Sequence, residues 1–220
     1  MKLKFPRYVW VCFVLMIVFQ FLTYYFSQIL TYDLYHYDFT IYGFDDKVPF
    51  IAIFIVPYIL AYPFWALTPF ILGKLPKDKY ISWAITALIH YVIFFIIYLL
   101  VPTTITRPVV SNDNIFNYLV NLIYISDSPE LPSNLFPSLH CSLSILCYLG
   151  VMRRKEFPKW YRIFSLIFAI LVCMSTQFIK QHYIVDFISA LVITVAAHMI
   201  VTKFKLYRFF IKKETVENGN

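Results

Sequence analysis

Long stretches without a charged residue dominate this chain and limit what it can fold into. Four of them can supply the roughly 20 apolar residues that a membrane helix needs, and two shorter ones follow. They run from Arg7 to Asp33, Lys47 to Lys74, Lys79 to Arg107, Glu130 to Arg153, Arg162 to Lys180 and Asp186 to Lys203. Hydrophobic residues make up 60% of the chain and charged residues 14%. Because so few polar groups cannot cover a soluble domain, the sequence excludes a soluble enzyme and a disordered chain and indicates an integral membrane protein.

We expect an all-α fold, a polytopic membrane protein built as a bundle of six transmembrane helices. The expected spans are residues 9–31, 49–73, 80–101, 134–152, 162–179 and 183–202. Together they form a single membrane domain over residues 1–213, followed by a disordered tail at 214–220. The first apolar run is too long for a signal peptide, and no small-residue cleavage site follows it.

Residues 113–125 have the pattern of a short helix that lies at the outer membrane interface. Asn114, Asn117 and Asn121 share one helical stripe, and the apolar side chains lie largely on the opposite face. We therefore expect a short extracytoplasmic interfacial helix beside the six spans.

The basic residues indicate how the spans are oriented. With a cytoplasmic N-terminus and alternating spans, 16 of the 19 Lys and Arg residues face inwards, and Lys47, Arg107 and Lys180 face outwards. This division follows the positive-inside rule and places both termini in the cytoplasm. The net charge of +7 then reflects topology and contact with anionic lipid heads in the bilayer, not nucleic-acid binding. We expect the plasma membrane of a bacterium, because the chain is compact and carries no recognisable organelle signal.

An ionisable side chain inside a span is costly, so each one is a functional candidate. His182 and Asp186 open the sixth span, and their i,i+4 spacing places them on one helix face. Asp186 can accept a hydrogen bond from one ring nitrogen of His182, which fixes the tautomer and leaves the other nitrogen exposed. His90 and His198 lie alone within spans, and we interpret them as neutral core histidines.

Further polar residues lie at the same outer ends of the spans. They are Arg107, Ser138, His140, Thr176 and Lys180. Two cations, together with the amide groups at the start of the fourth span, would form an anion site, most simply for phosphate.

Two segments resemble signatures of the type 2 phosphatidic acid phosphatase superfamily. Pro137-Ser138-Leu139-His140 resembles the P-S-G-H signature, with Leu139 in place of the Gly. Ser175-Thr176-x5-His182-x3-Asp186 resembles S-R-x5-H-x3-D, with Thr176 in place of the Arg. Of the first signature, K-x6-R-P, the chain has Arg107-Pro108, and Leu100 occupies the Lys position. These departures resemble the branch that contains fungal inositol phosphorylceramide synthases, and the resemblance covers about residues 45–200.

The resemblance implies a six-helix enzyme that needs no metal or other cofactor and forms a phosphohistidine. His182 would be the nucleophile, held by Asp186. His140 would protonate the leaving alkoxide and then activate the acceptor. The phosphate would be bound by Arg107 and the backbone near Ser138, with Thr176 and Lys180 as further candidates.

We expect a membrane-embedded phosphatase that hydrolyses a lipid phosphate monoester or diphosphate. The alternative is a phosphotransferase of the inositol phosphorylceramide synthase type, in which a hydroxyl acceptor replaces water. Two hypotheses from other classes remain open. His140, His182 and Asp186 would suit a catalytic metal, although such a ligand set does not explain Arg107 beside it. A non-enzymatic role with a decayed site would explain the missing Lys and Arg.

Overall fold

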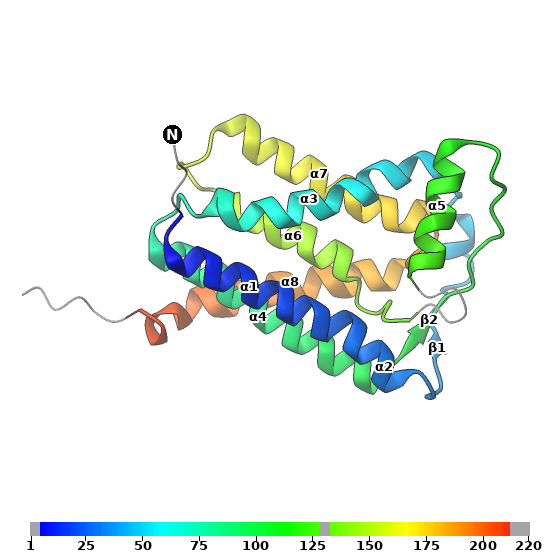
Figure 1. Ribbon diagram of the computed structural model, residues 1–220, viewed down its shortest axis with the longest axis horizontal. Coiled ribbons are helices and arrows are strands. Elements are labelled where there is room, and N and C mark those ends of the chain that lie inside the picture. Colours follow the sequence, from blue (N-terminus) through cyan, green and yellow to red (C-terminus); the bar gives the residue numbers. More distant parts are fainter. Residues whose placement is uncertain (1–4, 128–132, 212–220) are drawn as a thin grey trace, which may run out of the picture.

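Helices account for about 70% of the computed structural model, which describes residues 5–127 and 133–211 (Figure 1). The longer elements are α1 (Arg7–Phe21), the π-helical turn η1 (Leu22–Phe26), α2 (Ser27–Thr31), α3 (Ile55–Leu72), α4 (Lys77–Leu100), α5 (Ile115–Ser126), α6 (Leu139–Val151), α7 (Lys159–Phe178) and α8 (Ile184–Lys203). Short 3-10 helices are η2 (Asp45–Lys47), η3 (Ala52–Phe54) and η4 (Leu206–Phe209). The residues predicted to form a disordered tail lie outside the described part.

Five helices of the described chain are long and apolar enough to cross a membrane. They are Arg7–Thr31, Ala52–Leu72, Lys77–Leu100, Lys159–Phe178 and Ile184–Lys203. Their bounds agree with five of the expected spans to within a few residues. The fold is therefore that of an all-α, multi-pass membrane protein.

The expected span at 134–152 is shorter in the structure. α6 has 13 residues, or about 20 Å of helix, against a hydrocarbon core of about 30 Å. The helix begins only at Leu139 because Ser138 caps it, its hydroxyl accepting the amide of Cys141 at 3.3 Å, and because Pro137 cannot continue a helix towards the N-terminus. α6 packs against α3, α4, α7 and α8. It is thus the buried central helix of the bundle, and helix length alone supports five spans.

The short helix predicted at 113–125 is present as α5. Asn114 caps it by accepting the amide hydrogens of Phe116 and Asn117, both at 3.0 Å. Figure 1 shows α5 lying across one end of the bundle, at an angle to the long helices. Val120 and Tyr124 face inwards and pack with Tyr58 of α3. The membrane side on which α5 lies stays a prediction.

The two ends of the bundle differ in structure. The start of α1 and η4 lie at one end, and α5 lies at the other with strands β1 (Tyr37–Asp38) and β2 (Thr103–Thr104), which pair in parallel (Figure 1). At this second end the Asp45 carboxylate accepts the amides of Ile41 and Ile184 at 2.7 and 2.9 Å. These bonds hold the segment before α3 over the start of α8. The site residues predicted from the sequence lie at this same end of the bundle.

Candidate active site

His182 and Asp186 lie in contact at the start of α8. Nδ1 of His182 is 3.1 Å from Oδ2 of Asp186, and the same oxygen accepts the amide of Tyr183 at 2.9 Å. Both side chains are buried, with 6% and 1% exposed. A carboxylate at Nδ1 favours the tautomer that carries its proton there, which leaves the lone pair on Nε2.

Burial also determines the charge of His182. It lowers the pKa of the imidazole to about 3, and the positive charge of Arg107 acts in the same direction. The ring is therefore neutral around pH 7. A neutral imidazole with an available lone pair is the nucleophilic form of histidine.

His140 lies in the first turn of α6, opposite His182. The two ring centroids are 6.1 Å apart. The His140 ring stacks on Tyr58 at 4.3 Å, and the Tyr62 hydroxyl is 3.4 Å from its Nε2. The two rings thus flank a small space that both of them line.

Arg107 adds a buried positive charge beside the histidines. Its Nη2 donates to Oδ2 of Asp127 and to Oε1 of Gln181, each at 2.5 Å. Its Nη1 donates to the carbonyl of Tyr124 at 3.1 Å. Because Gln181 directly precedes His182, this contact places the guanidinium next to the predicted nucleophile.

Asp127 and Gln181 were missed by the sequence analysis. The position of Gln181 beside His182 was a usable signal, whereas nothing in the pattern around Asp127 distinguishes it from other outer carboxylates. Both contacts join segments far apart in the chain, 20 and 74 residues from Arg107. Such pairs are visible only after folding.

Asp127 is the ion-pair partner of Arg107, with side chains 13% and 9% exposed. Burial raises the pKa of the Asp127 carboxyl to about 8. The guanidinium opposes this shift, because two charges about 4 Å apart attract by about 4 kcal/mol at an effective dielectric constant of about 20. An attraction of this size favours the ionised form of Asp127. The negative carboxylate and the positive guanidinium then largely neutralise each other.

Ser138 and Thr176, two of the predicted phosphate ligands, form hydrogen bonds with backbone groups of the protein. The amide of Ser138 donates to the carbonyl of Asp186 at 3.1 Å, which ties the start of α6 to that of α8. The Thr176 hydroxyl is fully buried and donates to the carbonyl of Cys173 at 2.8 Å. The Thr176 carbonyl accepts the amide of His182 at 3.1 Å. Ser138 and Thr176 thus both lie beside the histidines, where their hydrogen bonds connect α6, α7 and α8.

The Lys180 side chain is also engaged by the protein. Its Nζ donates to the carbonyls of Asp45 and Val48 at 3.0 and 2.5 Å. It therefore holds the segment before α3 over the α7–α8 loop. Leu100, at the Lys position of the first signature, lies at the end of α4 and is 73% exposed. Arg107 and Lys180 both line the pocket that His182 adjoins, and Arg107 lies beside His182 through its contact with Gln181.

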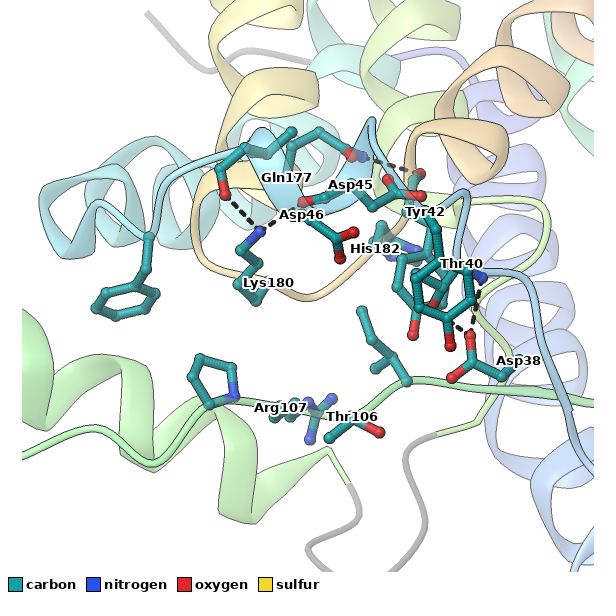
Figure 2. Close-up of a pocket in the computed structure, with 15 residues that line it drawn as sticks. Asp38, Thr40, Tyr42, Asp45, Asp46, Thr106, Arg107, Gln177, Lys180 and His182 are labelled. Atoms are coloured by element: carbon teal, nitrogen blue, oxygen red, sulfur yellow. Dashed lines mark hydrogen bonds between the residues drawn. The ribbon is translucent and has the colours of Figure 1, made fainter.

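Two cavities reach the histidines from different sides. The outer pocket has a volume of about 420 Å³ and is shown in Figure 2, where Arg107, Lys180 and His182 lie among its lining residues. The apolar cavity, of about 470 Å³, lies among α1, α3, α4 and α6 and is lined by His140 and by aromatic side chains such as Trp65 and Tyr91. A small space lined by both His140 and His182 lies between the rings. His182 therefore adjoins a polar pocket and His140 an apolar one.

A metal centre is not formed by the described residues. No group of three or more His, Cys, Asp or Glu side chains among residues 5–127 and 133–211 is arranged to hold a metal ion. The hypothesis that His140, His182 and Asp186 are metal ligands thus lacks the required geometry.

Comparison with known proteins agrees with these residues. The family model of the PAP2 superfamily matches residues 44–200, more than half of the chain. No curated protein and no solved structure matches the chain. This superfamily comprises enzymes of the phosphatase or phosphotransferase type that act on lipid phosphates. From the matched region, the chain belongs to the PAP2 superfamily.

Proposed function

We propose that the chain cleaves a lipid phosphate ester through a covalent phosphohistidine on His182. The observation that carries this proposal is the buried His182–Asp186 contact with His140 opposite, at a ring separation of 6.1 Å. Neutral His182 supplies the nucleophile, and the second histidine is positioned for proton transfer.

In the first step, Nε2 of His182 attacks phosphorus in line with the leaving oxygen. The P–O bond breaks, and His140 in its protonated form gives its proton to the departing alkoxide. Asp186 stabilises the positive charge that develops on the His182 ring. Arg107 and the first-turn amides of α6 face the charge on the non-bridging oxygens.

In the second step, the acceptor enters where the leaving group departed, beside His140. His140 takes the acceptor's proton as the acceptor oxygen bonds to phosphorus, the N–P bond breaks, and its electron pair returns to Nε2 of His182. Water as acceptor makes the chain a phosphatase for a lipid phosphate monoester or diphosphate. This remains the first candidate.

The second candidate is transfer to a lipid hydroxyl, as in the inositol phosphorylceramide synthase branch that the signatures resemble. The apolar cavity beside His140 favours it, because an acceptor that enters from this side comes from the lipid phase. The division of basic residues supports a site at the extracytoplasmic face of a plasma membrane.

Product analysis with purified protein in lipid nanodiscs tests the proposal. Lipid phosphates are incubated with and without a long-chain alcohol, and a radiolabelled phosphoenzyme is trapped. We expect an acid-labile phosphoenzyme that His182→Ala abolishes and that His198→Ala, a matched change in α8 away from the site, retains. A phosphate released into water, free or with its head group, identifies a hydrolase, and a phosphate ester of the added alcohol identifies a transferase. If folded protein cleaves no lipid phosphate, the proposal is wrong and a non-enzymatic role is favoured.

A further inference from the structure

A long apolar groove, here called the α1–α4 groove, lies apart from the cavities at the two histidines. Its volume is about 740 Å³, and its walls include Leu15 of α1, Leu88 of α4 and Phe209, at the end of η4. The cavities at the histidines are lined by other residues. An apolar surface of this size in a membrane protein is covered by hydrocarbon, which comes from lipid or from another protein surface.

The length of the groove matches the depth of one leaflet. Its lining residues on α4 extend from Ile81 to Ile93, which is about 18 Å at about 1.5 Å per residue. One leaflet contributes about half of a hydrocarbon core that is about 30 Å thick. Figure 1 shows η4 and the starts of α1 and α4 at the same end of the bundle. An acyl chain that enters at this end therefore fits the groove as far as the bilayer centre.

Basic side chains gather at the end of the groove where η4 lies. Lys77, the first residue of α4, has its Nζ 5.8 Å from the ring centroid of Tyr8, which lines the groove. Arg208 lies in η4 beside the lining residue Phe209, and Lys205 directly precedes η4. These three cations are exposed, and within residues 5–127 and 133–211 none of them has an ion-pair partner. The end of the groove therefore attracts an anionic head group.

Helix α1 has little protein packed against it apart from this region. Only Val9, Cys12 and Met16 of its 15 residues are buried. Cys12 lines the α1–α4 groove, whereas Phe13 and Met16, on another face of the helix, line the apolar cavity beside His140. Helix α1 thus separates the groove from that cavity, and hydrocarbon in the groove supports its outer side.

Charge and composition favour a phospholipid over two other occupants. The three cations outweigh the charge of the neighbouring Asp78 carboxylate. A second copy related by a two-fold axis would bring the same cations to the same end, and like charges repel. Residues 212–220 contain one apolar side chain, that of Val216, so the end of the chain supplies little hydrocarbon. An anionic phospholipid supplies both hydrocarbon and negative charge.

We propose that the α1–α4 groove binds one anionic phospholipid that is held and not cleaved. One acyl chain lies between α1 and α4, and the head-group phosphate meets Lys77, Lys205 and Arg208. The division of basic residues predicts that this end faces the cytoplasm, so the lipid belongs to the inner leaflet. The inference is independent of the proposed function, because the groove and the histidines have different lining residues.

Lipid titration of delipidated protein in a mild detergent tests the inference. Phosphatidylglycerol and phosphatidylcholine with the same acyl chains are added separately. Native mass spectrometry counts the bound lipids, and the thermal unfolding temperature is followed in parallel. We expect the first phosphatidylglycerol to bind at least tenfold more tightly than phosphatidylcholine and to raise the unfolding temperature. Equal affinities for the two lipids would overturn the inference, because the groove would then hold lipid by hydrophobic contact alone.

Charge variants locate the head group. Each Lys or Arg near an anionic lipid surface contributes about fivefold in affinity. The double variant Lys77→Gln, Arg208→Gln should therefore bind phosphatidylglycerol roughly 25-fold more weakly and phosphatidylcholine nearly as before. Arg153→Gln, Lys155→Gln is the matched control, because it makes the same changes on exposed side chains of the α6–α7 loop. Equal losses in the two double variants would contradict a defined head-group site at η4.

Filling the groove locates the acyl chain. Leu88→Trp enlarges a half-buried wall residue, so the tight phosphatidylglycerol and its effect on the unfolding temperature should be lost. Leu191→Trp makes the same change on α8, outside the groove, and should retain both. Undiminished binding by folded Leu88→Trp would place the lipid elsewhere, at the histidines for example, and overturn the inference. A wild-type dimer that Leu88→Trp dissociates would identify a second copy as the occupant instead. If Leu88→Trp does not fold, the charge variants still decide.

Discussion

Replacing Arg107 by Lys separates the charge of this side chain from its geometry. The guanidinium uses two nitrogens to contact Asp127, Gln181 and the carbonyl of Tyr124. Lys keeps the positive charge but has a single ammonium group, so it cannot reproduce the planar set of contacts. The variant therefore retains the electrostatic attraction and loses the orientation.

The expected loss follows from the contacts. A buried hydrogen bond to a charged group is worth about 1.5–3 kcal/mol. Losing one such contact to the phosphate in the transition state lowers kcat roughly ten- to hundred-fold. Because Arg107 is proposed to act on charge at the reacting phosphorus, kcat should fall more than KM rises.

The assay measures kcat and KM for a lipid phosphate with Arg107→Lys in nanodiscs, alongside its thermal unfolding. Arg208→Lys is the matched control, because it makes the same change on an exposed side chain of η4. A folded Arg107→Lys variant with kcat within about threefold of wild type would refute the reasoning, since ten-fold is the smallest loss worked out above.

Three further predictions concern the proton donor, the engaged lysine and the orientation. His140→Ala should slow turnover of alkyl phosphates by about 10²–10⁴-fold and of aryl phosphates much less, because a good leaving group needs little protonation; equal losses would argue against His140 as the acid. Lys180→Met should lower the thermal unfolding temperature, because two hydrogen bonds to the 45–48 segment are lost, and should reduce kcat less than Arg107→Lys. Equal damage would make Lys180 a phosphate ligand. With the four native cysteines buried, an impermeant thiol reagent should label Tyr42→Cys on intact cells and not Lys155→Cys; labelling only the latter would invert the topology.

Much of the fold follows from local patterns in the sequence. Charge-free runs of about 20 residues predict the five long helices, because only a helix satisfies its own backbone groups in lipid. The Asn stripe predicts α5, which the structure places at Ile115–Ser126. The length of α6, in contrast, does not follow from such a local pattern. Its sequence is as apolar as a span, but apolarity does not distinguish a lipid-facing helix from a central one that other helices cover.

In the candidate site too, some contacts follow from local sequence spacing and others do not. The contact of His182 with Asp186 follows from spacing alone, because side chains four residues apart share a helix face. The partner of Arg107 lies 20 residues away beyond α5, and Lys180 finds its carbonyl partners more than 130 residues earlier. Sequence spacing says nothing about such pairs.

Sequence alone thus indicates a membrane protein and names His182 and His140 as catalytic candidates, since hydropathy and i,i+4 spacing are local properties. The tertiary structure sets how much positive charge a phosphate group meets in the candidate site. It does so by pairing Arg107 with Asp127, by engaging Lys180 and by opening a polar pocket at His182 and an apolar one at His140. The physical reason is that net charge and cavity shape depend on side chains from distant segments, and only packing brings these together.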